Sequence, residues 1–158
     1  MTIDEIIDFM GGLDGVLAVS PAPGDGSPEI SWGDTFFFHS PDGAVPTATQ
    51  PFATIVTNDY PGDTGWRLDR PDAFRVNVAA GRQEFMRWTG RAPQTAATED
   101  ERAADDTVTA HPVYGSAGWL AVVNPGRRTD EPLRELLRRA HHLARARHDR
   151  RTSGSAGR

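Results

Sequence analysis

The chain has 158 residues, of which 37% are hydrophobic, and its formal net charge is −5. This length is typical of one domain whose hydrophobic core is large enough to be stable without covalent cross-links. The sequence contains no cysteine and no lysine, which excludes disulfides, thiol nucleophiles, thiolate metal sites, Schiff-base chemistry and the phosphate-binding lysine of a P-loop.

Charge is divided unevenly along the sequence. Residues 1–66 carry ten acidic side chains and no cation, whereas residues 127–158 carry ten arginines against four acids. We therefore expect an anionic ligand or acidic partner to meet the second half of the chain. Arginine stays protonated at physiological pH, so acid–base chemistry would fall to His, Asp, Glu or Tyr.

The first predicted element is an amphipathic helix that starts at Ile3. Apolar residues recur there at i, i+3, i+4, i+7 and i+10, Thr2 is placed to cap the helix, and a Gly-Gly pair ends it. The N-terminus lacks the positive charge of a secretory signal, and no segment approaches the roughly 20 apolar residues of a membrane helix. We expect a cytoplasmic protein.

Strand-like segments follow a short apolar run at 16–19 and a turn-rich loop over 20–31. The predicted strands are residues 35–39, 52–57 and 73–79.

The third of these strands alternates clearly between its two faces. Phe74, Val76 and Val78 share one face, while Arg75 and Asn77 share the other. Such alternation suits an antiparallel sheet that is covered on only one side.

The second half of the chain predicts more helix and strand. In order, it contains a short helix (82–89), a polar loop that we expect to be mobile (91–106), two strands (107–111 and 119–124) and a long helix that opens at 129–132.

The order of these elements predicts an α+β fold. It has a single antiparallel sheet, with the N- and C-terminal helices packed on one face and the other face at least partly open. We expect residues 1–148 to form a single domain and the low-complexity residues 149–158 to form a disordered basic tail.

Four stretches resemble the YjbR/MmcQ-like proteins. They are the apolar strand 35–39, the strand-and-helix unit 72–88, the tryptophan-led strand 119–123 and the closing helix 132–147. The chain is similar to an uncharacterised bacterial family related to that group, which has the CyaY-like fold. The resemblance implies a small YjbR-like α+β fold whose concave sheet surface is comparable with those of nucleic-acid and small-ligand binders.

Candidate ligand-binding residues gather on the predicted open face. Arg75 and Asn77 are polar anchors there, and His39 is a candidate for the same face, subject to the strand register. The rim would hold His39, Tyr60 and His111. The aromatic wall would come from Trp32 or Trp66, which lie in glycine-flanked loops, although packing of these loops onto the sheet is the alternative.

The leading prediction is therefore a small-molecule-binding domain without a cofactor, acting as a monomer or homodimer. One alternative is a cofactor-free enzyme in which Asp59 orients His39 or His111 for proton transfer. Another is a nucleic-acid or protein interaction module that uses the arginine-rich last helix, although the acidic net charge disfavours nucleic acid. Adjacent His141 and His142 cannot share one metal, so no metal site is predicted.

Overall fold

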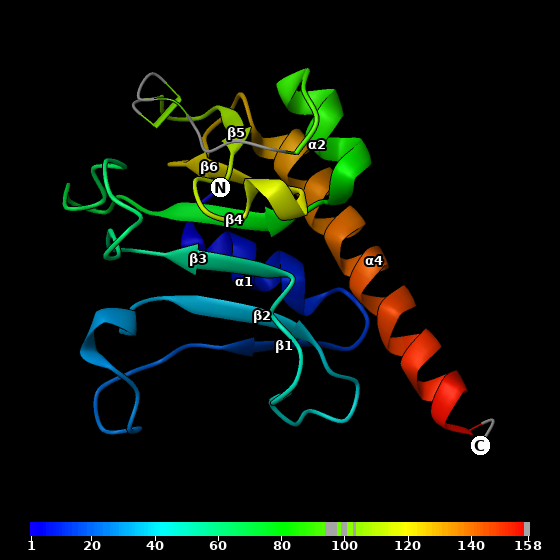
Figure 1. Ribbon diagram of the computed structural model, residues 1–158. Coiled ribbons are helices and arrows are strands. Elements are labelled where there is room, and N and C mark those ends of the chain that lie inside the picture. The colour runs from blue at the N-terminus through cyan, green and yellow to red at the C-terminus, as the bar shows by residue number, and fades with distance from the viewer. Residues whose placement is uncertain (94–97, 99–100, 103, 157–158) are drawn as a thin grey trace.

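The computed structural model describes residues 1–93, 98, 101–102 and 104–156, the last two of these for their backbone only. Within these residues one six-stranded antiparallel sheet runs in the order β1-β2-β3-β4-β6-β5 (Figure 1). The strands are β1 (Val16–Val19), β2 (Thr35–His39), β3 (Ala53–Val56), β4 (Arg75–Ala79), β5 (Val108–Ala110) and β6 (Trp119–Val123). The predicted α+β class is confirmed.

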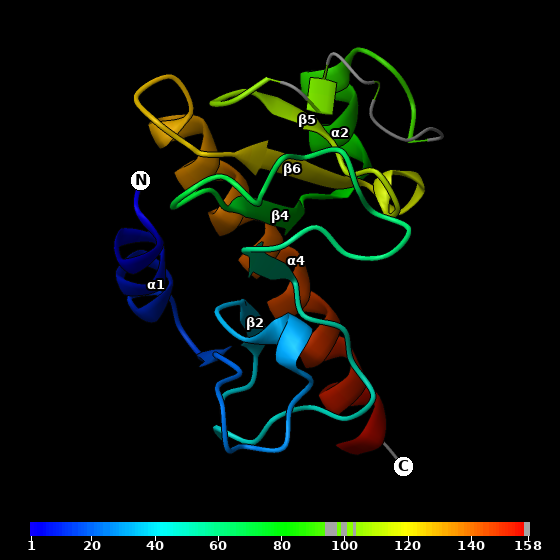
Figure 2. The ribbon, with the colours of Figure 1, turned by 90° about the vertical axis from the view of Figure 1, so that its left-hand side faces the viewer.

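Helices α1 (Ile3–Gly11) and α4 (Asp130–Ala156) lie on the same face of this sheet, and α2 (Gly81–Thr89) lies at its β5 end (Figures 1 and 2). The predicted capping box is present at the start of α1, where Thr2 Oγ1 accepts a hydrogen bond from the Glu5 backbone N–H at 3.1 Å. None of the described helices is both long and apolar enough to cross a membrane.

The main core fills the space between the helices and the sheet. Apolar stripes at helical spacing on α1 and α4 meet alternate side chains of the strands, because a strand presents every second residue to one face. The buried residues include Ile6, Met10, Leu133, Leu136, Leu137 and Ala140 from the helices and Phe37, Ile55, Val76, Val78, Leu120 and Val122 from the sheet.

A second, smaller core lies on the opposite face of the sheet. Trp66 and Leu68 pack there on Val56, Ala121 and Val123. The connection between β3 and β4, residues 57–74, therefore covers part of the face that the sequence predicts to be open. Over β1 to β3 this face carries no α-helix among the described residues, and a short 3₁₀ turn, Glu29–Ser31, lies beside β2 (Figure 2).

In the second half of the chain one sequence prediction differs from the structure, and another falls partly on residues that the structure does not describe. Helix α4 continues to Ala156 through the segment predicted as a disordered tail from residue 149. Its buried stripe ends at Ala144, and the helix then runs past the sheet (Figure 1). The predicted mobile loop over 91–106 includes residues 94–97, 99–100 and 103, which lie outside the described part of the chain.

Candidate functional site

The strand register brings a band of half-buried side chains onto the face opposite α1 and α4. Phe36 lies opposite Thr54, and Thr54 opposite Asn77. In the adjacent row Ala79 lies opposite Trp119. We call this region the open-face hollow and define it by Phe36, Phe38, Thr54, Ala79 and Trp119 from the strands together with His111 and Tyr114 from the turn after β5.

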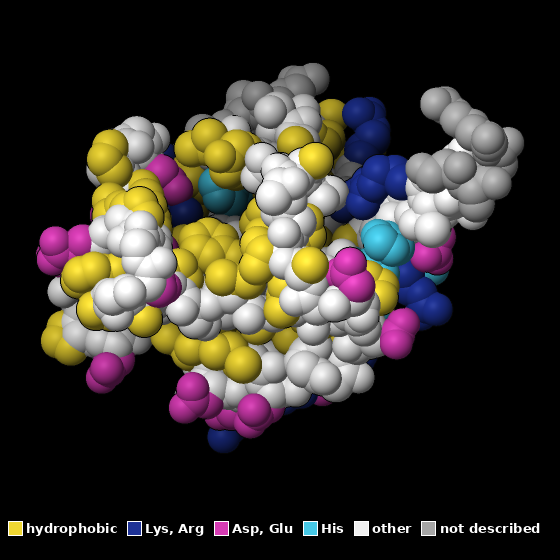
Figure 3. All heavy atoms as spheres, turned by 90° about the horizontal axis from the view of Figure 1, so that it is seen from below, with side chains coloured by type: hydrophobic (Ala, Val, Ile, Leu, Met, Phe, Trp, Pro, Cys, Tyr) yellow, Lys and Arg dark blue, Asp and Glu magenta, His cyan; other side chains and the backbone are white. Residues whose placement is uncertain are grey.

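Seen from below, the molecule has a hollow around which hydrophobic side chains gather, with a histidine inside it (Figure 3). Phe36, Phe38 and Trp119 are each only partly buried. Several partly exposed rings on one face of a sheet are unusual for a surface that faces only water.

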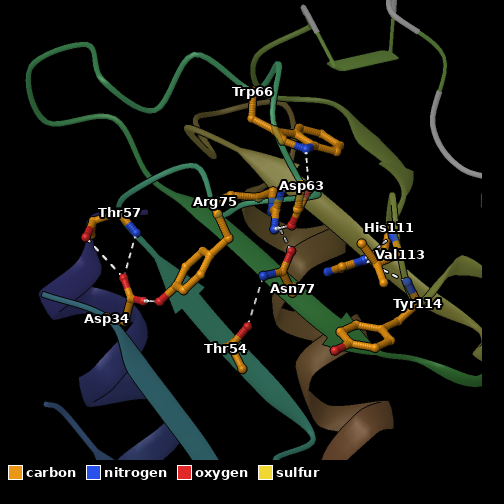
Figure 4. A network of polar contacts seen from close by, with 11 residues as sticks. Asp34, Thr54, Thr57, Asp63, Trp66, Arg75, Asn77, His111, Val113 and Tyr114 are labelled. Atoms are coloured by element: carbon orange, nitrogen blue, oxygen red, sulfur yellow. Dashed lines mark hydrogen bonds and ion pairs between the residues drawn. The ribbon is translucent and has the colours of Figure 1, made fainter. Parts of the chain in front are cut away.

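A buried ion pair closes one end of the hollow (Figure 4). Arg75 donates to both carboxylate oxygens of Asp63, at 3.1 and 2.6 Å, and its Nε donates to Asn77 Oδ1 at 2.7 Å. The Trp66 ring lies 4.6 Å from the Arg75 guanidinium, and its Nε1 donates to Asp63 at 2.7 Å. Asn77 in turn donates to Thr54 Oγ1 at 2.9 Å. The charge of Arg75 is thus neutralised within the protein.

This network corrects the prediction that Arg75 and Asn77 are accessible anchors. Both are only 2% exposed, because the segment containing Asp63 and Trp66 packs over them. Trp66 itself is 1% exposed, so packing onto the sheet, the alternative considered for this residue, is correct. The alternation of apolar and polar residues along β4 correctly predicts the face that carries Arg75 and Asn77, but only tertiary packing decides whether that face is covered.

His111 lies just beyond β5 and is buried. Its Nδ1 accepts hydrogen bonds from the backbone N–H groups of Val113 and Tyr114, both at 3.0 Å. Burial, with a smaller contribution from the Arg75 cation, lowers the pKa of His111 to about 3, and Asp63 opposes the shift. The ring is therefore neutral at physiological pH, and Nδ1 is fixed as an acceptor.

Asp34 and Tyr60 form a second polar pair beside the sheet. Asp34 is fully buried and accepts hydrogen bonds from the Thr57 backbone N–H at 2.8 Å, from Thr57 Oγ1 at 3.1 Å and from the Tyr60 hydroxyl. Burial raises the pKa of Asp34, whereas these hydrogen bonds oppose the rise. Burial and the contact with Asp34 raise the pKa of Tyr60. The predicted rim residue Tyr60 is thus protonated, and its hydrogen bond to Asp34 links that residue to the segment 57–60.

His39 lies on the face of the sheet opposite the one predicted for it, which carries Arg75 and Asn77. Thr35 lies opposite Ile55, which lies opposite Val76, so the side of β2 that carries His39 faces the helices. Its ring lies 5.6 Å from that of His141 and 5.0 Å from that of His148, both on α4. Both His39 ring nitrogens are buried without a hydrogen-bond partner, and burial lowers the pKa of this ring.

The proton-transfer pairs predicted with Asp59 do not form among the described residues. His39 has no partner at either nitrogen, and the Nδ1 of His111 is taken by backbone groups. Asp59 Oδ1 is buried without a partner, as is Nε1 of the half-buried Trp32. No group of three metal-ligating side chains suitable for an ion is found in the described part of the chain.

Two shallow recesses lie elsewhere, beside the N-termini of α1 and α4. One, of about 630 Å³, is lined by residues that include Thr57, Leu68 and Arg70, and the other, of about 480 Å³, by residues that include Arg127 and Pro132. Neither contains a predicted ligand-binding residue.

Sequence reasoning missed Phe36, Phe38 and Trp119 as site residues. The run of three phenylalanines at 36–38 identifies a strand but does not say which rings face the core. Pairing with β1 and β3 decides this, burying Phe37 and leaving Phe36 and Phe38 on the open face.

The sequence model of DUF6194, a family of unknown function, matches residues 1–153. The chain belongs to this family. No match was found to a curated protein or to a solved structure. The DUF6194 match carries no activity and no ligand, and the likeness to YjbR/MmcQ-like proteins stays a prediction.

Proposed function

We propose that this DUF6194 protein binds a small molecule in the open-face hollow. The observation that carries the proposal is the partial exposure of Phe36, Phe38 and Trp119 on one face of the sheet, with the buried His111 ring 6.0 Å from that of Trp119. Ligand sites typically combine such an apolar surface with a few polar groups in fixed positions. The network around Arg75 supplies that rigidity, because a salt bridge, two further hydrogen bonds and a ring contact connect Arg75 with Asp63, Trp66 and Asn77.

The charges at the site favour a ligand without net charge. Arg75 is the cation nearest to the Asn77 side chain, and its charge is balanced by Asp63 at 2.6 Å. Since His111 is neutral, the hollow offers an anion no unpaired positive group from these residues. A flat apolar body with a small polar end is the chemistry that fits.

Titration of the ¹⁵N-labelled protein with indole or acetophenone tests this function. We expect chemical-shift changes to centre on Phe36, Phe38, Ala79 and Trp119. The variant Ala79→Leu places three additional carbon atoms in the hollow and should weaken binding of both probes. Ala18→Leu is the matched control, since Ala18 is exposed on β1 and points to the other face, opposite Phe37.

Two results would contradict the proposal. One is the absence of localised shift changes at millimolar probe concentration. The other is equal binding of the probes to the wild type and to a folded Ala79→Leu variant.

The geometry favours binding over the acid–base alternative. A general base works best with a pKa near the operating pH, whereas His111 is shifted to about 3. The described contacts also give His111 no carboxylate partner on Nδ1.

A further inference from the structure

The position of the proton on His111 follows from its hydrogen bonds. Two backbone N–H groups point at Nδ1, so this nitrogen must present its lone pair. In a neutral imidazole the other nitrogen then carries the proton. Nε2 is therefore a donor, and it points from the turn toward Asn77 (Figure 4).

The neighbouring polar groups are already engaged with one another. Asn77 accepts from Arg75 through Oδ1 and donates to Thr54 through Nδ2. The Tyr60 hydroxyl donates to Asp34, and the Trp66 N–H donates to Asp63. Among the described residues nothing accepts a hydrogen bond from His111 Nε2, so this N–H is available to donate to a ligand.

The surroundings of Nε2 select an uncharged partner. A ligand carboxylate bound here would lose its hydration and would lie close to the negative charge of Asp63. The Arg75 guanidinium could not offset this cost, because both oxygens of Asp63 already bind it. A carbonyl oxygen needs only one donor, so its desolvation is offset by the single Nε2–H bond.

The shape of the hollow defines the remainder of the ligand. The rings of Tyr114 and Trp119 lie 5.0 and 6.0 Å from the His111 ring, and their own centroids are 5.9 Å apart. A planar ring attached to the carbonyl would extend from His111 over this aromatic surface toward Phe38.

Resting on the function proposed above, we infer that the ligand is an aromatic carbonyl compound, such as a ketone, ester or amide, whose oxygen accepts the Nε2 proton of His111. His111 is then a specificity-determining residue that rejects ligands whose polar end can only donate.

The first test reads the tautomer directly. Long-range ¹H–¹⁵N correlation of the histidine rings at pH 7 should show a protonated Nε2 and an unprotonated Nδ1 for His111. A proton on Nδ1 would overturn the inference, whatever the protein binds.

The second test compares acetophenone with isopropenylbenzene, which has the same shape but no acceptor. We expect the wild type to bind acetophenone about 3- to 10-fold more tightly, the range of one neutral hydrogen bond. His111→Asn keeps an acceptor oxygen near the Nδ1 position and removes the Nε2 donor, so it should bind both probes equally. His111→Gln, which places an amide donor near Nε2, should keep part of the preference.

The outcomes separate the two proposals. Equal binding of the two probes to the wild type, or an undiminished preference in a folded His111→Asn variant, overturns the acceptor requirement but leaves small-molecule binding standing. Failure of both probes to bind in the hollow overturns the proposed function, and the inference falls with it.

Discussion

Arg75 illustrates the difference between a buried and an exposed ion pair in one chain. The side chains of Arg75 and Asp63 are 3% and 12% exposed, whereas those of the pair formed by Arg70 and Asp105 are 30% and 40% exposed. Removing one partner of a buried pair leaves the other charge without compensation.

We therefore expect Arg75→Met to lower the free energy of unfolding by about 3–5 kcal/mol. The matched control, Arg70→Met, should lower it by less than about 1 kcal/mol, because water solvates the Asp105 carboxylate that remains. Urea unfolding of both variants measures the difference. Similar losses in the two variants would mean that Asp63 is not buried as described.

His111 should make the protein sensitive to acid. Its pKa is about 3 in the folded chain and near 6.5 in the unfolded chain. As the pH falls below 6.5 the unfolded chain takes up a proton that the folded chain does not. The contribution of the neutral His111 to the free energy of unfolding is therefore fully present above pH 6.5 and is lost toward pH 3.

Between pH 6.5 and 4.5 this one group should cost about 2–3 kcal/mol of stability. His111→Asn, which cannot titrate, should lose correspondingly less over the same interval. Urea unfolding at both pH values checks this, and parallel losses in the wild type and the variant would assign the acid sensitivity to other groups.

At the scale of the elements, β2 and α4 meet at a cluster of histidines. His39 of β2 lies between His141 and His148 of α4. Burial, together with the nearby His148, His141 and Arg145, lowers the pKa of His39, whereas Asp149 raises it. The folded chain therefore favours the neutral ring.

Acidification should loosen this contact, because protonating His39 places a charge on a buried ring that has no hydrogen-bond partner and lies near the Arg145 cation. We expect amide hydrogen exchange in α4 after Ala140 to accelerate between pH 7 and pH 5, once corrected for the intrinsic effect of pH. The variant His39→Phe, which keeps a ring but not the titration, should abolish most of this acceleration. An unchanged acceleration would place its origin outside the cluster.

Elements with local signals were predictable, and their relative placement was not. The stripe of α4 and the capping box of α1 follow from residues within one or two turns of one another. The face of β2 that carries His39 depends instead on pairing with β1 and β3, since a shift of one residue would exchange its two faces.

At the scale of the whole molecule, the acidic first third and the basic last helix of the sequence contact each other within one chain. Arg145 of the basic helix lies 3.6 Å from Asp14 in the acidic first third, and His141 Nε2 contacts the Asp14 carbonyl oxygen at 2.6 Å. An exposed pair of this kind contributes little energy, but it directs the helix toward its own acidic segment.

We accordingly expect the mass in sedimentation experiments to be the same at 20 and 500 mM salt. If the basic helix instead met the acidic segment of a second copy, the mass would rise at low salt, because that attraction is screened as ionic strength increases. Such a rise would contradict the intramolecular assignment.

The sequence by itself determined what kind of side chains this protein can use and most of the segments that become helix or strand. Absence of Cys and Lys, apolar spacing in the terminal helices and alternation around Arg75 and Asn77 are local properties, so they can be read without coordinates. Only the tertiary structure decided that Trp66 and Asp63 bury that pair, that His39 faces the helices and that Phe36, Phe38 and Trp119 remain uncovered. The physical reason is that these outcomes depend on strand register and on where the 57–74 connection packs, both of which join residues far apart in the chain.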